Sequence, residues 1–387
     1  MHIAMLLANG FRPDVRVLKE AQSLTALGHT VSVICWDRAA EFVARETLPG
    51  GVEITRIQHI RSGYGLGARQ LLKIPLFWRA VLPILDQLRP DLVHCHDFDT
   101  LPAGLWWGKS HRKPVVYDAH EYYADLCKPR LHGAAGGLLY RAIRLAEHAA
   151  ARAASAVITV DETLAAIYRP RNRRVIVVGH YPPRHMAAEP NPVFSRPTLT
   201  LLYAGRLSVD RGLLLYADVL RCLRENGIAA RLRLAGVFTP ASDEQAFRQR
   251  IGGLEAEVEF LGWTPYADMP ALLRSADVGL SILLPEPRYT AALPVKLFEY
   301  MAAGLPVLAS DFLPVRQVVT AADCGTLVNP LDEAAKIAEI LIAWQRSPNT
   351  PRRLGENGRQ AVLKRYNWEA VIGQVDQLYQ FLANHPS

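Results

Sequence analysis

The stretch from Pro294 to Asp311, PVKLFEYMAAGLPVLASD, has the pattern of a helix followed by a buried strand. Lys296 and Glu299 are three residues apart, so both project to the same side of the first helical turns. Gly304 can take the left-handed conformation that ends a helix, and the apolar run from Leu305 to Ala309 suits a parallel strand. A helix start carries free N–H groups and a partial positive charge that suit a phosphate. The stretch therefore predicts either an anion-binding αβ step or an ordinary one with Glu299 in solvent.

The same alternation of short apolar strands and helical patterns extends over the whole chain. In the first half, strands are predicted at residues 3–8, 30–35, 52–56, 92–95, 115–118, 156–160 and 175–178. Helices are predicted there at residues 16–27, 69–87, 100–109, 137–154 and 162–168. In the second half, strands are predicted at residues 199–203, 230–234, 258–260, 278–282, 306–309 and 325–328. This order predicts two parallel sheets with helices on both faces.

The length of 387 residues suits two domains. A proline-rich segment poor in periodicity, from Tyr181 to Pro197, separates the two series and reads as a linker. Asn367 begins a last helical pattern that continues to about Leu382. The sequence has no uncharged apolar run of about 18 residues, so no membrane-spanning helix is predicted. The first residues lack the positively charged region with which a signal peptide begins. The five cysteines form no CxxC pair, so neither a zinc site nor a disulfide framework is indicated.

The net charge of +7 is unevenly distributed along the sequence. Residues 1–190 contain 24 Lys and Arg against 17 Asp and Glu, whereas residues 191–387 contain 20 of each. This excess indicates an anionic partner for the first half. Nucleic acid is not supported, because no recognition motif accompanies the basic residues. An anionic membrane surface is the alternative partner.

The segment from Arg69 to Leu88 alternates basic and apolar residues and offers two interpretations. In one, it lies on a lipid surface with Phe77 and Trp78 inserted and Lys73 and Arg79 near the headgroups. In the other, it is an ordinary core-facing amphipathic helix with a kink at Pro75.

Several motifs together resemble the retaining glycosyltransferases of family 4. The stretch from residue 296 to 311 resembles their donor signature, and Ala204-Gly205-Arg206-Leu207 with Arg211-Gly212 resembles their phosphate loop, with Arg in place of the usual Lys. The segments PDLVHCHD at residues 90–97 and VYDAHE at residues 116–121 resemble the family's strand ends, and VEFLGW at residues 258–263 fits as well. The resemblance covers nearly the whole chain.

The resemblance implies an α/β protein of the GT-B fold, with two Rossmann-like domains that face each other across a cleft. We expect an acceptor-binding domain at residues 1–182, a linker at 183–197 and a nucleotide-sugar-binding domain at 198–366. We expect the final helix, residues 367–387, to pack back on the first domain.

The resemblance also assigns roles in the second domain. Arg206, Arg211 and Lys296 would hold the diphosphate, because fixed cations stabilise the charge of a leaving phosphate. Glu299 would accept the ribose hydroxyls. The expected donor-binding residues are Gly205, Arg206, Arg211, Gly236, Trp263, Tyr266, Val295, Lys296, Leu297 and Glu299. The family's other glutamate should stand at Ala291 and is absent, and Glu286 is the nearby carboxylate that could replace it.

In the first domain, the resemblance assigns His120 to the sugar side of the donor, which makes it a catalytic candidate with Arg206, Arg211, Lys296 and Glu299. The expected acceptor-binding residues are Phe11, Arg12, Arg16, His96, Glu121 and Tyr122. Asp97-Phe98-Asp99 spells a DxD that could ligate a metal, yet the family needs none, so we expect neither a metal nor a cofactor. No GxGxxG follows the first strand, which disfavours a nicotinamide enzyme.

We therefore predict a retaining, metal-independent glycosyltransferase that moves a hexosyl unit from a nucleotide-diphosphate sugar to a hydroxyl acceptor. A lipid-linked or saccharide acceptor in cell-surface polysaccharide or glycolipid synthesis is expected. The expected location is the cytoplasm, with peripheral contact at the inner face of the cytoplasmic membrane. A sugar-nucleotide epimerase of the same fold is one alternative, which the missing glutamate disfavours. A catalytically silent binding subunit is the other, which the intact cations disfavour.

Overall fold

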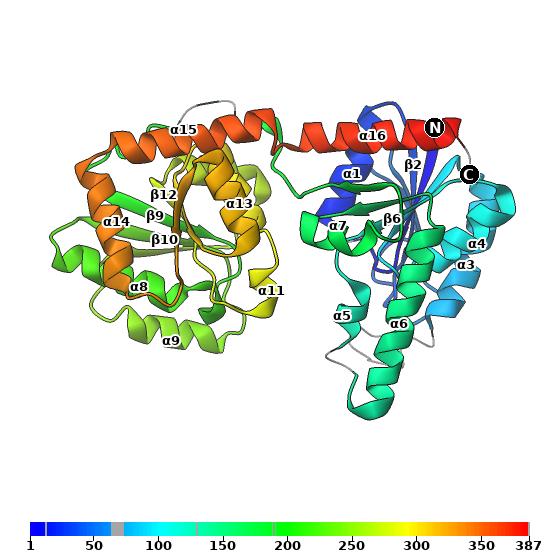
Figure 1. The fold of residues 1–387 in the computed structure, drawn as a ribbon, viewed down its shortest axis with the longest axis horizontal. Helices are drawn as coiled ribbons and strands as arrows, with labels where there is room; N and C mark the ends of the chain where they lie inside the picture. Colours follow the sequence, from blue (N-terminus) through cyan, green and yellow to red (C-terminus); the bar gives the residue numbers. More distant parts are fainter. Residues whose placement is uncertain (12–13, 63–72, 129–130, 188, 190, 386–387) are drawn as a thin grey trace. The chain divides into compact units, whose positions relative to one another are not determined.

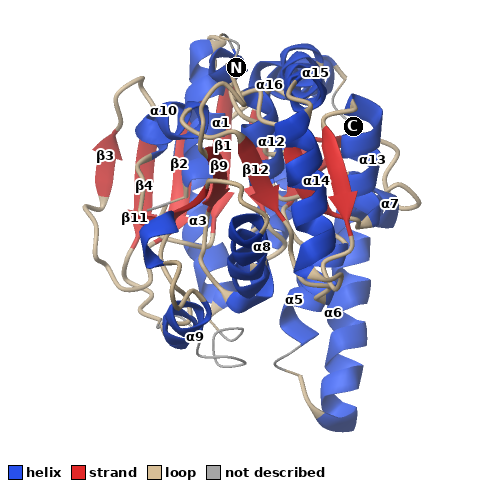
Figure 2. Cartoon of the chain, turned by 90° about the vertical axis from the view of Figure 1, so that its left-hand side faces the viewer, coloured by secondary structure: helices blue, strands red, loops and turns tan. Residues whose placement is uncertain are grey.

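The computed structural model describes residues 1–387 except 12–13, 63–72, 129–130, 188, 190 and 386–387. The chain divides into two compact units (Figure 1). The first contains Met1–His180 together with Val371–Ser387, and the second contains Tyr181–Ala370. Helices and strands alternate in both units (Figure 2).

The first unit is built on an eight-stranded sheet of order β3-β4-β2-β1-β5-β6-β7-β8. Neighbouring strands are parallel except for β3, which pairs antiparallel with β4 at one edge. The strands are β1 (His2–Leu7), β2 (Thr30–Trp36), β3 (Arg45–Thr47), β4 (Glu53–Ile57), β5 (Leu92–His96), β6 (Val115–Ala119), β7 (Ala156–Thr159) and β8 (Val175–Val177).

Helices pack against this sheet and bury its apolar side chains. They are α1 (Val15–Ala26), α3 (Ile74–Leu88), α4 (Leu101–His111), α5 (Tyr123–Cys127), α6 (Gly133–Ala153), α7 (Glu162–Tyr168) and α16 (Trp368–Asn384). The sheet residues alternate along each strand, so Val93 and Cys95 join one core with α3 and α4. His94, which lies between them, faces the side of Glu20 in α1 and Tyr379 in α16.

The second unit contains a six-stranded, fully parallel sheet of order β11-β10-β9-β12-β13-β14. Its strands are β9 (Leu199–Ala204), β10 (Ala230–Ala235), β11 (Val258–Gly262), β12 (Val278–Ser281), β13 (Val307–Ser310) and β14 (Gly325–Val328). Its α-helices are α8 (Leu213–Glu225), α9 (Ser242–Arg250), α10 (Met269–Arg274), α11 (Pro287–Thr290), α12 (Val295–Ala302), α13 (Leu313–Ala322), α14 (Ala334–Arg346) and α15 (Asn349–Lys364). Short 3₁₀ turns lie at Arg184–Ala187, Val209–Arg211, Glu255–Glu257 and Tyr266–Asp268.

The predicted αβ step around residue 300 is confirmed. Helix α12 begins after Pro294, Gly304 takes a left-handed φ of 68°, and strand β13 follows. The predicted last helix is confirmed as α16, most of which belongs to the first unit. Residues 183–197, expected as a linker, belong to the second unit, where Val193 and Phe194 are buried in its core.

The structure contradicts the membrane-inserted interpretation of the segment from Arg69 to Leu88. Phe77 is fully buried and stacks on Trp36, with ring centroids 5.3 Å apart. Pro75 lies in the first turn of α3, where a missing N–H has no helical partner to lose, so the expected kink at Pro75 is also wrong. Residues 69–72 of the segment lie outside the described residues. Among the described helices, none combines the length and the apolar character that crossing a bilayer requires.

Candidate active site

Each sheet has a point where the strand order reverses, and ligands of open parallel sheets bind beside such points at the carboxyl ends of the strands. In the first unit, β1 lies between β2 and β5. In the second unit, β9 lies between β10 and β12. The loops that follow β1, β5, β6 and β9 therefore hold the residues of interest.

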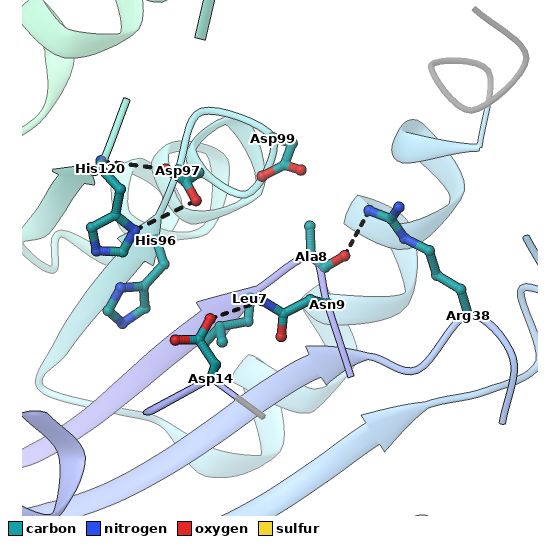
Figure 3. Close-up of a pocket in the computed structure, with 9 residues that line it drawn as sticks. All are labelled: Leu7, Ala8, Asn9, Asp14, Arg38, His96, Asp97, Asp99 and His120. Atoms are coloured by element: carbon teal, nitrogen blue, oxygen red, sulfur yellow. Dashed lines mark hydrogen bonds and ion pairs between the residues drawn. The ribbon is translucent and has the colours of Figure 1, made fainter. Parts of the chain in front are cut away.

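In the first unit, the segments that follow β1, β2, β5 and β6 surround a cavity of about 170 Å³ (Figure 3). Charged and amide side chains provide most of its walls. The lining residues are Leu7, Ala8, Asn9, Asp14, Arg38, His96, Asp97, Asp99 and His120. Two predicted residues, His96 and His120, are thus brought together at one cavity.

A cluster of imidazoles converges on one buried carboxylate behind this cavity. His94 and His96 are two residues apart in β5, so they share one face of the sheet, and the strand register places His96 opposite Asp118. One oxygen of Asp118 lies 2.8 Å from His120 Nε2, 3.0 Å from His96 Nδ1 and 3.4 Å from His94 Nε2. His120 also approaches Asp97, whose Oδ2 lies 3.5 Å from Nδ1.

His120 and Asp118 form a buried ion pair. Burial by itself lowers the pKa of His120, but the charge and hydrogen bond of Asp118 outweigh it and raise that pKa to about 10. Burial by itself raises the pKa of Asp118, and the charge of His120 with the imidazole hydrogen bonds outweighs it and holds that pKa well below its ordinary value. The nearby His180 has its pKa lowered to about 4 by burial and by the charge of His120. At neutral pH the cavity is therefore bordered by a protonated His120.

Glu20, His94, His96 and Asp118 are also residue types that could hold a metal ion. One donor atom of each lies within 4.8 Å of the others, and all four residues are buried. The Asp118 oxygen already contacts three imidazoles, which gives these residues a role in fixing His120 without an ion. Metal independence stays a prediction.

The loop after β1 is shaped by its own hydrogen bonds. Asp14 caps α1 by accepting from Val17 N at 3.3 Å and also accepts from Asn9 Nδ2 at 3.0 Å. Phe11, a predicted acceptor residue, is buried in a left-handed turn that Asn9 Oδ1 closes at 2.8 Å. Arg16 is exposed, and Arg12 lies outside the described residues.

The remaining acceptor candidates follow β6. Glu121 is exposed. Tyr122 is half-buried, and its hydroxyl lies 2.7 Å from His148 Nε2. Neither residue lines the cavity described above.

In the second unit, the loop after β9 is closely packed and depends on glycine. Gly236, which directly follows β10, has a φ of 151°, and a Cβ there would lie 1.8 Å from the carbonyl oxygen of Gly205 after β9. Gly205 has a φ of 137°, and a Cβ there would lie 3.1 Å from Lys296 Nζ. The loop after β9 therefore passes directly beside the start of α12.

Two arginines of this loop share one tyrosine. Arg206 and Arg211 donate to the Tyr289 hydroxyl at 3.1 Å and 3.2 Å. The same hydroxyl donates to Asp210 at 2.9 Å, and Asp210 also pairs with Arg288. The Tyr289 hydroxyl thus fixes the two guanidinium groups that are predicted to bind phosphate.

Lys296 is the third basic residue of this group and it is buried. Its Nζ lies 3.5 Å from the centre of the Tyr203 ring and makes no hydrogen bond among the described residues. Burial and then the charge of Arg211 lower its pKa well below the ordinary value. An anion at this point would relieve that destabilisation of the charged amine, because an opposite charge favours the charged form.

The other donor candidates occupy varied positions. Glu299 is half-buried in the turn of α12 that follows Lys296. Trp263, Tyr266 and Val295 are exposed, whereas Leu297 is fully buried in the core. Ala291 and Glu286 are both exposed, so neither the missing glutamate position nor its nearest substitute is enclosed.

Sequence reasoning missed several members of both groups. In the first unit these are Asn9, Asp14, Glu20, Arg38, His94 and Asp118, whereas Asp97 and Asp99 were considered only as possible metal ligands. In the second unit these are Tyr203, Asp210 and Tyr289. The spacing of His94 and His96 could have indicated a shared face, whereas no motif surrounds Tyr289.

Both units match one family. Residues 14–182 match the sequence model of glycosyltransferase family 4, and residues 198–346 match that of the glycosyl transferases group 1. A GDP-mannose-dependent alpha-(1-6)-phosphatidylinositol dimannoside mannosyltransferase of Mycobacterium tuberculosis is 30% identical over 319 residues, which is 77% of each chain. The chain belongs to glycosyltransferase family 4.

Further family 4 relatives match over a shorter stretch. A phosphatidyl-myo-inositol mannosyltransferase of Mycobacterium leprae is 32% identical over 189 residues, which is 49% of this chain and 48% of that protein. The chain thus spans about half the length of the first curated relatives it matches. The fold is that of HepE from Anabaena in complex with UDP, with a TM-score of 0.72, 18% identity and coverage of 99% of this chain and 100% of that one. The two parallel-sheet units therefore have the GT-B fold.

Proposed function

We propose that this family 4 protein transfers a hexosyl unit from a nucleotide-diphosphate sugar to a hydroxyl acceptor, with retention at the sugar carbon and without a metal. The observation that carries the proposal is the group of Arg206, Arg211 and Lys296 in the second unit. Two of these cations are fixed by the Tyr289 hydroxyl, and the third is a buried amine that an anion would stabilise. Such a group suits a diphosphate, which carries charge on several oxygens.

The proposed roles follow from this placement. The three cations hold the diphosphate and stabilise the charge that develops as the bond to the sugar breaks. Glu299, one turn along α12, accepts hydrogen bonds from the ribose hydroxyls. Since the leaving phosphate itself can accept the proton of the attacking hydroxyl, no pair of catalytic carboxylates is required of the protein.

The first unit is the proposed acceptor side. Its cavity combines carboxylates with the protonated His120, and such groups bind hydroxyls by accepting and donating hydrogen bonds. The relatives named above act on phosphatidylinositol compounds, which supports a lipid-linked acceptor and contact with an anionic membrane. The name of one relative specifies GDP-mannose, and HepE was solved with UDP, so both bases belong in the first screen.

A melting-temperature screen against UDP-, GDP- and ADP-sugars tests the donor site, because a ligand that binds the native state raises its melting temperature. One nucleotide is expected to raise it. Arg206→Ala is expected to abolish that rise and the transfer of sugar while the fold is kept. Arg248→Ala, which removes an exposed arginine of the same unit, is the matched control and is expected to change neither. Unchanged transfer in the Arg206 variant would refute the phosphate role.

A further inference from the structure

Helix α6 of the first unit has one buried face, which is anchored through a carboxylate. Glu147 is fully buried and accepts hydrogen bonds from the hydroxyls of Tyr117 at 3.0 Å and Tyr168 at 2.6 Å. It also accepts from the backbone N–H groups of Tyr123 at 3.1 Å and Ala124 at 3.0 Å. These bonds fix which side of α6 faces the unit, and therefore which side faces away from it.

The opposite face of α6 carries exposed leucines. Leu138, Ala142, Leu145 and Ala149 follow the spacing that places residues on one side of a helix, and all four are exposed. The exposed fractions are 68% for Leu138 and 64% for Leu145. Leu139 of the same helix and Leu126 of α5 are also exposed. Leucines gathered this way on one surface mark an interaction site more often than a solitary one does.

Arginines accompany the leucines on this face. Arg141 and Arg152 lie on the same stripe as Leu138 and Leu145. Arg144 lies on the flank between that stripe and the buried face of Glu147, and all three arginines are exposed. Glu147 is the only acidic residue of α6, and it faces inward. We call the set of Leu138, Leu139, Arg141, Ala142, Arg144, Leu145, Ala149 and Arg152 the α6 surface.

The α6 surface is apolar and basic at once, and this combination selects its partner. Leucines can enter the acyl boundary of a bilayer while arginines reach the phosphates of the headgroups. A second copy of this chain fits less well, because a two-fold contact would join two patches that carry arginines and no acidic residue to pair with them. The amino-terminal part of α6 also extends beyond the strands of its sheet in both views (Figures 1 and 2), so the surface is presented by a projecting element.

We propose that the α6 surface docks the first unit on an anionic lipid bilayer, with Leu138 and Leu145 entering the headgroup boundary and Arg141 and Arg144 binding lipid phosphates. The inference rests on the proposed function, because docking on a bilayer would bring the protein to a lipid-linked acceptor. It replaces the segment from Arg69 to Leu88 as the membrane contact, since Phe77 of that segment is in the core.

Cosedimentation of the full chain with vesicles tests the proposal. Vesicles of phosphatidylglycerol and phosphatidylcholine in equal parts are compared with vesicles of phosphatidylcholine alone, without donor or acceptor. The wild-type chain is expected to bind the anionic vesicles at least about tenfold more tightly. Leu138→Glu with Leu145→Glu is expected to reduce that binding at least about tenfold, and Arg141→Ala with Arg144→Ala to remove most of the anionic preference.

The matched control is Leu313→Glu with Leu331→Glu, which changes two leucines of the second unit that are 65% and 71% exposed. It is expected to bind vesicles like the wild type. Equal binding by the control and the α6 leucine variant would overturn the proposal. So would wild-type dimers, measured by light scattering, that the α6 changes convert to monomers without any effect on vesicles.

Melting temperatures confirm that each variant is folded. The nucleotide screen on the same variants separates this inference from the proposed function. If the chain binds nucleotide but not vesicles, only the proposed role of the α6 surface is refuted. If it binds vesicles but no nucleotide, only the proposed donor site is refuted.

Discussion

The buried ion pair of His120 and Asp118 predicts a specific dependence of stability on pH. The folded pKa of His120, about 10, lies above its ordinary value of 6.5. A histidine whose folded pKa is raised contributes stability that is complete below its unfolded pKa and is lost as the pH rises toward its folded pKa. With these two values, protonation of His120 contributes about 4–5 kcal/mol near pH 6 and about 1 kcal/mol near pH 9.

Asp118→Asn removes the larger of the two carboxylate charges that raise this pKa, and Asp97 is the other. Asp97, 3.5 Å away, still raises the pKa of His120 in the variant, but burial opposes it. That pKa is therefore expected far below about 10, and most of the contribution near pH 6 is lost. The carboxylate of Asp118 is ionised in both the folded and the unfolded wild type across this range, because its folded pKa is lowered from the ordinary 3.8. The difference in unfolding free energy between wild type and variant is therefore expected to shrink by about 3 kcal/mol between pH 6 and pH 9.

Urea unfolding of both proteins at the two pH values measures this change. Asp86→Asn is the matched control, because Asp86 pairs with His111 at 3.4 Å on the surface, where both side chains are about half exposed. Exposed pairs contribute little, so its difference from wild type is expected to stay constant with pH. A constant difference for Asp118→Asn as well would refute a protonated, carboxylate-paired His120 in the folded chain.

Three further predictions concern the second unit. Tyr289→Phe removes the hydroxyl that fixes Arg206 and Arg211. A hydrogen bond to a charged group contributes about 1.5–3 kcal/mol, and the lower end applies because Arg206 is partly exposed. The value of kcat/KM is therefore expected to fall about tenfold, with little change in melting temperature. Lys296→Met removes a buried amine whose pKa is lowered, so the melting temperature without nucleotide is expected to be unchanged or higher. The rise in melting temperature caused by nucleotide is expected to be lost. If that rise is retained, the phosphate role of Lys296 is contradicted. Gly236→Ala would place a Cβ 1.8 Å from Gly205 O and is expected to destabilise the chain by about 1–3 kcal/mol in urea unfolding, whereas Gly373→Ala, with open space around it in α16, is expected to be neutral or slightly stabilising.

The strands could be predicted from the sequence because most of them are buried on both faces and read as short apolar runs. Strand β3 could not, since Arg45–Thr47 is a polar edge strand that pairs on one side only. For the segment from Arg69 to Leu88, the membrane-inserted interpretation was wrong for a different reason. Its basic and apolar alternation fits a membrane surface and a core-facing helix equally, and only the contact of Phe77 with Trp36 decides between them.

The candidate sites were predictable where a motif ends a strand and unpredictable where distant loops meet. His96 and His120 follow strands β5 and β6, but their shared partner Asp118 depends on the register that sets His96 opposite it. Tyr289 contacts residues 78 and 83 positions away. Such a contact leaves no pattern in a single sequence, because it arises only from the neighbouring positions of β9 and β12 in the sheet.

The distribution of charge by halves and the proposed diphosphate site point to different parts of the chain, and the placement of the charged side chains accounts for the difference. The first half has the excess of basic residues, yet the cavity of the first unit is lined by Asp14, Asp97 and Asp99. The second half is balanced, yet it gathers Arg206, Arg211 and Lys296 around one loop. Net charge reports what surrounds a domain, whereas a ligand responds to the few groups within a Debye length of about 8–10 Å. The basic excess of the first half includes the exposed arginines of α6. The diphosphate is proposed to bind in the second unit, which is nearly neutral, with 21 Lys and Arg against 20 Asp and Glu in residues 181–370.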